Sequence, residues 1–426
     1  MQSHKTRTLW LVGMLHGFTH VYQVALLPLY FLIREDFRLA SVGEATLLVT
    51  VMMAAYFIPS YPMGILADRF SRKRLLGVGL LINAVGFIAL ALAPNYGFAL
   101  FGVALAGFGG SFFHPAATSL IAGLFPTNTG RALGYIGMGA SVGFFIGPLY
   151  AGWRAAEAGS WRAPVLELGL LGLLGAALFI WLGEEKPKGE SPASTLRHPA
   201  AMFPTPVLWA LFIGMSLAMS LRDFAGSSMG SLGSLFLQQA HGFKPDQTGL
   251  TLSSIFLAAT ISNPLFGHLS DRGRIRWTTF VLIMASLLVA LFPHVPRSGL
   301  IPAFAIYGFF FMASYPMVEA ALMEAVPDAV RGRVFGLFIT VGGLIGNVSH
   351  WIVGDWVQRL GEAGKTPEGY FGLYRLLAAF ILLSMLGLLC LKAIRKREQH
   401  IEAERSHTLP GGPVTSPTAV RNPHAE

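Results

Sequence analysis

Apolar runs long enough to cross a membrane recur along the whole chain, and short polar segments separate them. A helix needs about 20 apolar residues to span the hydrocarbon core of a bilayer. Twelve runs meet this length, at residues 10–33, 45–66, 75–93, 97–122, 131–153, 164–182, 206–237, 248–269, 277–293, 299–325, 333–357 and 370–391. The pattern predicts an all-α membrane protein with twelve transmembrane helices in a lipid bilayer. The first run is too long for a signal-peptide core, so we expect it to persist as the first span.

One polar segment divides the twelve runs into two groups of six. Residues 183–205 contain four prolines and three basic residues, a composition typical of a cytoplasmic linker. We therefore expect an N-terminal six-helix half at residues 1–182 and a C-terminal six-helix half at residues 206–397. Residues 398–426 are polar and contain several Pro and Gly residues, so we expect a disordered cytoplasmic tail there.

Short motifs of the first half recur in the second half at a nearly constant offset. The matching segments are Gly64–Arg69 with Gly267–Arg272 at an offset of 203, His114-Pro115 with Tyr315-Pro316 at 201, and Gly130-Arg131 with Gly332-Arg333 at 202. This repetition indicates a duplicated six-helix unit, and therefore two pseudo-symmetric halves. Internal repeats with a binding site at their interface are typical of secondary transporters.

The charge pattern supports the membrane interpretation and predicts an orientation. Charged residues make up 12% of the chain, against about 25% in soluble domains. The net charge of +9 does not indicate nucleic-acid binding, because the basic residues form short clusters between apolar runs. Loops on the side of the N-terminus hold 19 Lys and Arg residues, and the opposite loops hold 8. This bias predicts a multi-pass protein of the cell membrane with both termini in the cytoplasm.

No motif indicates an enzyme or a cofactor. The sequence has no Gly-x4-Gly-Lys-Ser/Thr loop, so direct use of ATP is not expected. A membrane enzyme would need a nucleophile–base pair or a metal cluster, and neither can be identified in the predicted spans. We expect a monomer that moves a small-molecule substrate, with no cofactor and no resident metal.

The loop after the second predicted span resembles the corresponding loop of the major facilitator superfamily, and a degraded copy follows the eighth span. An aspartate at such a helix end can pair with a nearby arginine or face the positive N-terminus of a neighbouring helix. We hypothesise that this contact latches one conformation and breaks in the other, while a glycine allows close helix approach. The alternative is that the charges are solvated and only set the topology. The latch residues are Gly64, Asp68, Arg69, Arg72, Asp271 and Arg272.

The fifth predicted span resembles the superfamily motif that is associated with proton-coupled exporters. It carries Gly134, Gly143, Gly147 and Pro148 at the spacing of that motif, with one glycine of the final pair replaced by alanine. Gly139, Gly143 and Gly147 form a ridge at i, i+4 and i+8, which predicts close approach of another helix. The alternative is an ordinary packing ridge without a role in transport direction.

Motifs in the first, fourth and seventh spans resemble the fosmidomycin-resistance-type exporters of this superfamily. They are His16–Gln23, Gly107–Pro115 and Leu221–Asp223. The superfamily fold implies that spans 1, 4, 7 and 10 line a central cavity. The intramembrane ionisable residues fall on these four spans, and such residues are functional candidates by default. They are His16, His20, His114, Arg222, Asp223 and Glu319.

Arg222 is the candidate for attracting a negative group of the substrate, since a permanent charge at membrane depth needs an anionic partner. The alternative is a structural ion pair with Glu319 or Asp223. We consider a pair with Asp223 poor, because successive helical residues point about 100° apart. Glu319 is the first candidate for a proton carrier and Asp223 the second. A carboxylate whose surroundings alternate between apolar groups and an arginine would load and release a proton. Many proton-coupled exporters instead use a basic residue within helix 4, which this chain lacks.

The polar stripe of the first span is the other candidate. His16 and His20 are i, i+4 neighbours, and histidine titrates near neutral pH, so His16 could carry a coupling proton. The alternatives are two satisfied polar residues in a wet cavity or a metal site, for which two histidines are weak support. The predicted substrate contacts are Arg222, His20, Gln23, His114 and Tyr315. Taken together, the sequence predicts a proton-coupled exporter (antiporter) of a small organic compound, anionic or amphiphilic. The alternative is a proton-coupled uptake symporter for a sugar or organic acid.

Overall fold

The structure is a computed structural model, which describes residues 2–185, 201–327 and 330–408. These residues form helices and connecting turns, and no strand occurs among them. The N-terminal half contains α1 (Gln2–Val24), η1 (Leu27–Leu29), α2 (Tyr30–Asp36), α3 (Val42–Phe57), α4 (Ser60–Arg69), α5 (Arg72–Ala91), α6 (Tyr96–Gly110), α7 (Phe113–Leu124), α8 (Thr129–Ala158) and α9 (Arg162–Leu182). The C-terminal half contains α10 (Pro206–Gln239), α11 (Pro245–Ser270), α12 (Arg274–Leu291), η2 (Phe292–His294), η3 (Arg297–Gly299), α13 (Leu300–Phe311), α14 (Ser314–Ala325), α15 (Arg331–Asn347), α16 (Ser349–Leu360), η4 (Gly361–Lys365), η5 (Pro367–Tyr370), α17 (Phe371–Ser384) and α18 (Leu386–Thr408).

The predicted all-α membrane architecture is confirmed, with differences at the first span. Eleven helical segments of the described chain are long and apolar enough to cross a membrane, and α1 is not among them. Its residues include His16, Thr19 and His20, which lower the hydropathy of this helix. The run predicted at residues 10–33 is interrupted, because α1 ends at Val24 and η1 and α2 follow. Pro28 lacks the N–H that would continue the helical hydrogen bonds there.

The repeated motif of spans 4 and 10 marks a repeated break in the helix. The α6–α7 break lies just before His114-Pro115, and the α13–α14 break lies just before Tyr315-Pro316. A proline ring clashes with the carbonyl four residues earlier and donates no hydrogen bond, so both spans bend at this position. His114 and Tyr315 therefore directly follow equivalent helix breaks in the two halves.

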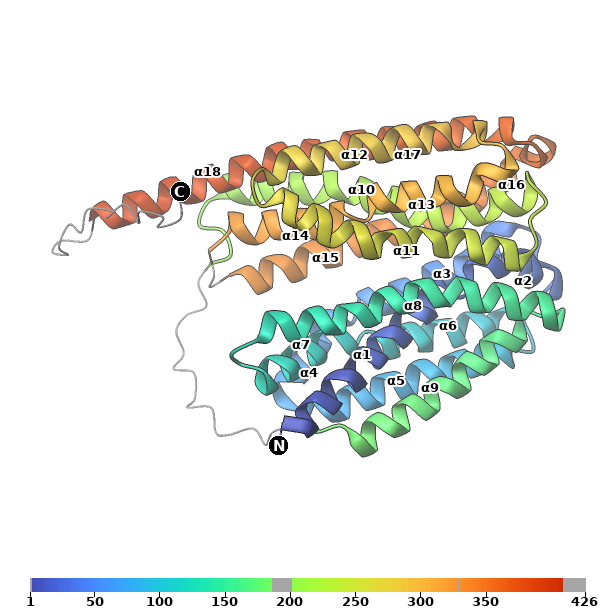
Figure 1. Cartoon of the computed structure of the whole chain (residues 1–426), viewed down its shortest axis with the longest axis horizontal. Coiled ribbons are helices and arrows are strands. Elements are labelled where there is room, and N and C mark those ends of the chain that lie inside the picture. Colours follow the sequence, from blue (N-terminus) through green and yellow to red (C-terminus); the bar gives the residue numbers. More distant parts are fainter. Residues whose placement is uncertain (1, 186–200, 328–329, 409–426) are drawn as a thin grey trace, which may run out of the picture.

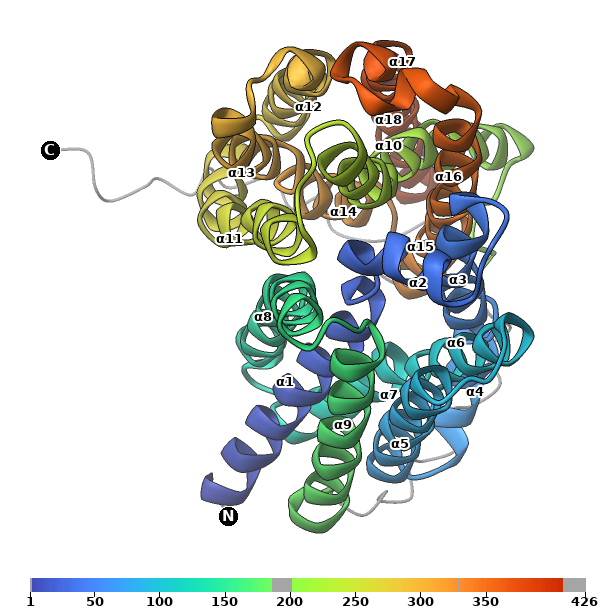
Figure 2. The same cartoon turned by 90° about the vertical axis from the view of Figure 1, so that its right-hand side faces the viewer.

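The two halves touch at one end of the molecule, which we call the joined end. A β-carbon on Gly354 of α16 would collide with Thr46 of α3, and one on Gly249 of α11 would collide with the carbonyl of Pro148 in α8. These backbone approaches bring α3 against α16 and α8 against α11, as Figure 2 shows from the joined end. Towards the opposite end the two bundles diverge (Figure 1). We call that end, where α4, α7, α14 and α15 lie, the basic end.

The glycine ridge of span 5 is used as predicted for packing. A β-carbon on Gly139 or Gly143 would collide with the carbonyl oxygen of Gly13 or Gly17 in α1. The third glycine, Gly147, faces the Val21 backbone at 3.1 Å from its would-be β-carbon. These contacts hold α1 tightly against α8, while Gly134 has no such neighbour within 4 Å.

The predicted tail begins later than expected. Helix α18 continues to Thr408, so the expectation of disorder from residue 398 is wrong for residues 398–408. This stretch contains three glutamates, and glutamate has high helix propensity. Residues 409–426, and residues 186–200 of the predicted linker, lie outside the described chain.

Candidate functional site

Three histidines from two helices form one wall of the candidate site. His16 and His20 lie one turn apart on α1, and their Nε2 atoms are 3.1 Å from each other. The ring of His114, on α7, lies 5.2 Å from the His16 ring and 6.1 Å from the His20 ring, centroid to centroid. His16 and His20 are buried, while His114 is exposed. The structure therefore adds a third imidazole to the two that the sequence placed side by side.

Fixed partners orient the two α1 histidines. His16 Nδ1 donates to the carbonyl oxygen of Ile136 in α8 at 2.9 Å, and His20 Nδ1 donates to Gln23 Oε1 at 2.8 Å. The His16 ring stacks on Phe113 with 4.5 Å between centroids, and the His20 ring contacts Phe144 at 4.1 Å. The predicted residues His16, His20, Gln23 and His114 are thus brought together in one cluster.

An ion pair on α10 forms the centre of the opposite wall. Arg222 Nε and Nη2 donate to Asp223 Oδ1 at 3.0 and 2.7 Å. The expectation that these neighbours would not pair is wrong. Their backbone directions do diverge, but the long arginine side chain folds back so that its guanidinium reaches the carboxylate. The Arg222 side chain is only 2% exposed, against 15% for Asp223.

Helices α14 and α15 complete this charged wall. The Arg222 guanidinium lies over the Tyr315 ring, 4.1 Å from its centroid, and Nη1 donates to the Ser314 carbonyl at a long 3.4 Å. Glu319, one turn after Tyr315, is half-buried and interacts electrostatically with both charges of the pair. Two glycines of α15, Gly342 and Gly346, leave the space that Asp223 fills. The predicted residues Arg222, Asp223, Tyr315 and Glu319 therefore lie in one cluster.

A polar network at the joined end was not identified from the sequence. Ser231 Oγ on α10 lies 2.8 Å from Tyr30 Oη of α2 and 2.6 Å from His350 Nδ1 of α16. His350 Nε2 in turn lies 3.2 Å from Asn347 Oδ1. We call these four residues the Ser231 network. The buried hydrogen bond between Tyr30 and Ser231 links the two halves, and the other bonds of the network lie within the C-terminal half. Only these long-range contacts distinguish the four residues from ordinary polar residues of a membrane helix.

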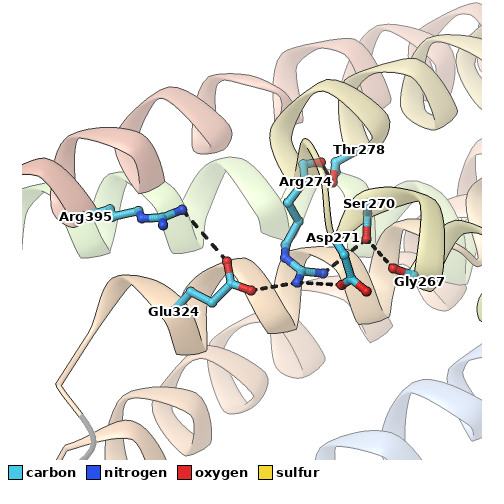
Figure 3. A network of polar contacts seen from close by, with 7 residues as sticks. All are labelled: Gly267, Ser270, Asp271, Arg274, Thr278, Glu324 and Arg395. Atoms are coloured by element: carbon cyan, nitrogen blue, oxygen red, sulfur yellow. Dashed lines mark hydrogen bonds and ion pairs between the residues drawn. The ribbon is translucent and has the colours of Figure 1, made fainter. Parts of the chain in front are cut away.

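In the loop predicted to form the C-terminal latch, Asp271 pairs with Arg274 rather than with Arg272. Arg272 is exposed. Arg274 Nη2 lies 3.3 Å from Asp271 Oδ1 and 2.6 Å from Glu324 Oε1 of α14, and Nη1 donates to Ser270 Oγ at 3.1 Å (Figure 3). Arg395 of α18 lies 3.9 Å from the same glutamate. The network therefore ties the ends of α11, α12, α14 and α18 together within one half.

The equivalent loop of the N-terminal half is held by Glu185. Its carboxylate accepts from Ser71 Oγ at 2.5 Å and from the backbone N–H groups of Arg72 and Lys73 at 3.0 and 3.2 Å. These donors are the free N–H groups at the start of α5. Arg69 is exposed, and the side chain of Asp68 lies outside the described structure.

The close approach predicted for Gly64 is not found in this conformation. A β-carbon at Gly64 would meet only Pro115, at an ordinary 3.9 Å. Gly64 lies towards the basic end, where the two bundles are apart.

Comparisons with known proteins agree with this architecture. The model of the Major Facilitator Superfamily matches residues 9–350. The fosmidomycin resistance protein of Escherichia coli is 23% identical over 343 residues, 78% of this chain and 83% of that protein. Multidrug resistance protein MdtH of Shigella dysenteriae is 26% identical over 331 residues, 74% of this chain and 79% of that protein. A bacterial homolog of the human lysosomal transporter Spinster, crystallised in an inward-facing and unoccupied conformation, superimposes with a TM-score of 0.76 at 16% identity, covering 93% of this chain and 98% of that one.

Proposed function

The chain belongs to the Major Facilitator Superfamily, and from this premise we propose that it is a proton-coupled exporter of a small organic compound, anionic or amphiphilic. As a member of this superfamily it is a multi-pass membrane transporter rather than an enzyme. Relatives named for fosmidomycin resistance and multidrug resistance support the export direction. The glycine motif of α8 supports the same direction.

We propose that both termini are cytoplasmic and that the molecule works by alternating access. The Lys and Arg bias places the basic end at the cytoplasm. The two halves are joined at the other end by the Ser231 network and by glycine contacts, and they diverge towards the basic end (Figure 1). His114, which lies between helices near the middle of the chain's fourth span, is exposed in this state. These features support an inward-facing conformation, from which rocking of the halves would open the joined end.

The single observation that carries proton coupling is the charge balance around Arg222. One arginine faces two carboxyl groups, Asp223 and Glu319. The Arg222–Asp223 pair is neutral, so ionised Glu319 leaves one uncompensated negative charge at membrane depth, where such a charge is costly. Binding one proton at Glu319 removes that charge. Glu319 is therefore our first proton carrier and Asp223 the second.

We place the substrate between the two walls of the cavity. His20, Gln23 and His114 offer hydrogen-bonding groups from the N-terminal half, and Tyr315 offers a half-buried aromatic ring from the C-terminal half. The Arg222 guanidinium lies against the Tyr315 ring, 4.1 Å from its centroid, so its charge attracts a negative group of a substrate bound at Tyr315. In the present conformation the Arg222 guanidinium donates two hydrogen bonds to Asp223. For direct contact with the substrate, it must give up at least part of this interaction.

Transport direction is the decisive test, because the rival function is a proton-coupled uptake symporter. A deletion strain and an overexpressing strain are screened against a toxic-compound panel at two external pH values. Active compounds are then added to energised everted vesicles whose internal acidity is followed by a fluorescent dye. Proton release when compound is added outside supports exchange. Protons that leave only together with compound preloaded inside would establish the symporter instead.

The anion role of Arg222 has its own test. Binding of the active compounds is measured for Arg222→Ala and for Arg222→Lys, which keeps the charge but not the planar fork. We expect Arg222→Ala to weaken binding of anionic compounds more than binding of neutral ones. Unchanged affinity for every anionic compound would remove this role.

A further inference from the structure

The histidine cluster of the N-terminal half has the composition and geometry of a metal site. We propose that His16, His20 and His114 together bind a divalent d-block cation of the Zn²⁺ class. One ring nitrogen of each histidine can be chosen so that all three lie within 4.8 Å of one another. The proposal does not depend on the proposed export function, since it rests only on the geometry of these three side chains and their hydrogen bonds.

The hydrogen bonds of the cluster leave two lone pairs facing each other. His16 Nδ1 must carry a proton, because its partner is the backbone carbonyl of Ile136, which only accepts. His20 Nδ1 likewise donates to Gln23 Oε1. In a neutral imidazole the second nitrogen then has no proton. With this orientation of the Gln23 amide, the two Nε2 atoms, 3.1 Å apart, present lone pairs to each other, an arrangement that a cation between or beside them stabilises.

The spacing of the nitrogens suits a tetrahedral cation. With Zn–N distances of about 2.0–2.1 Å and tetrahedral angles, two ligand nitrogens lie about 3.3 Å apart. The Nε2 atoms of His16 and His20 are already at 3.1 Å. His114 needs a small movement to complete three ligands, and it is the exposed member of the group. A single proton shared between His16 and His20 would leave His114 without a role, whereas a metal cation can take all three imidazoles as ligands.

The surroundings match those of histidine ligands in metal sites. Metal-bound histidines usually donate their other ring N–H to a carbonyl or carboxylate oxygen, which fixes the ring and its tautomer. His16 and His20 both do so, through Ile136 and Gln23. The ligands are three nitrogens with no carboxylate in the group, which favours Zn²⁺, Co²⁺ or Ni²⁺ over Mg²⁺ or Ca²⁺. Three histidines leave a fourth position open for water or for an oxygen of a small molecule.

The experiment titrates Co²⁺ into the purified full-length protein, free of any affinity tag, at pH 7.5, and follows the visible bands of four-coordinate Co²⁺. Competition with Zn²⁺ gives the affinity for the spectroscopically silent ion. We expect one Co²⁺ per chain that Zn²⁺ displaces, and a melting temperature that Zn²⁺ raises. Loss of an outer-shell partner alone costs about 10–100-fold in affinity. We therefore expect Gln23→Leu to weaken binding within that range and His114→Gln to weaken it at least as much.

His114→Gln is the central variant because His114 is exposed, so the fold should tolerate the change. His268→Gln is the matched control, since His268 is likewise an exposed histidine, on α11 of the other half, and lies outside both the cluster and the Ser231 network. Its Co²⁺ affinity should equal that of the unaltered protein. The proposal is overturned if the unaltered protein binds no Co²⁺ at millimolar concentration, or if His114→Gln and His268→Gln bind it equally well.

Discussion

Removing the hydroxyl of Ser231 should open the joined end. In the present conformation this group bonds Tyr30 of the N-terminal half and His350 of its own half, so Ser231→Ala removes one hydrogen bond that links the halves. Each buried hydrogen bond contributes about 1 kcal/mol. When the joined end opens, water hydrogen-bonds to the same groups, so the substitution destabilises only the closed conformation. The loss of about 1 kcal/mol corresponds to a shift of roughly fivefold in the ratio of the two conformations.

The shift can be measured as a distance distribution between spin labels. Labels are attached at Glu35→Cys and Glu362→Cys, exposed positions of the two halves near the joined end, after Cys390 is replaced by Ser. Ser231→Ala should raise the population with the longer distance. Ser228→Ala is the control, because Ser228 is buried on the same helix and its hydroxyl has no hydrogen-bond partner in the described structure. Equal distributions for the two alanine variants would refute the role assigned to the Ser231 network.

Two further predictions concern the ends of the bundle. Gly249→Val should prevent the joined end from closing, because the valine side chain would collide with the Pro148 backbone, and such overpacking costs about 1–3 kcal/mol. The same pair of spin labels reports the change in distance. Gly267→Ala is the control and should leave the distances unaltered, because a β-carbon there meets nothing within 4 Å. Arg274→Gln should lower the melting temperature of the purified protein by a few degrees, since it removes contacts to Ser270, Asp271 and Glu324 worth up to about 1 kcal/mol each when partly exposed. Arg272→Gln should leave the melting temperature unchanged. A larger decrease in melting temperature for Arg272→Gln than for Arg274→Gln would contradict this assignment and favour Arg272, the residue that the sequence indicated.

The architecture was predictable because its determinants are local in the sequence. Apolar run lengths gave the spans, and the repeated motifs gave the two halves. The glycine ridge of α8 predicted a close helix partner, although its identity, α1, requires the folded structure. The break after Val24 was missed, although Pro28 marks it, because hydropathy alone does not register a helix interruption.

The contacts of the site depend on distances that the sequence does not contain. His114 joins His16 and His20 only because α7 packs against α1. The Arg222–Asp223 pair was misjudged because backbone direction does not determine where a long flexible side chain ends. Likewise Arg274 reaches Asp271 and Glu324 while Arg272 is exposed, and the spacing of the two arginines in the sequence does not distinguish them.

The central claim is that a proton on Glu319 drives transport, and Glu319→Gln tests it most directly. The variant mimics the protonated side chain permanently, so exchange of labelled for unlabelled compound across the membrane should continue within about twofold of the unaltered protein. Uptake driven by a proton gradient in everted vesicles should fall by at least about tenfold, equivalent to 1.4 kcal/mol or more. Glu157→Gln, an exposed carboxylate far along α8, should preserve both activities. Undiminished gradient-driven uptake in Glu319→Gln would contradict the claim.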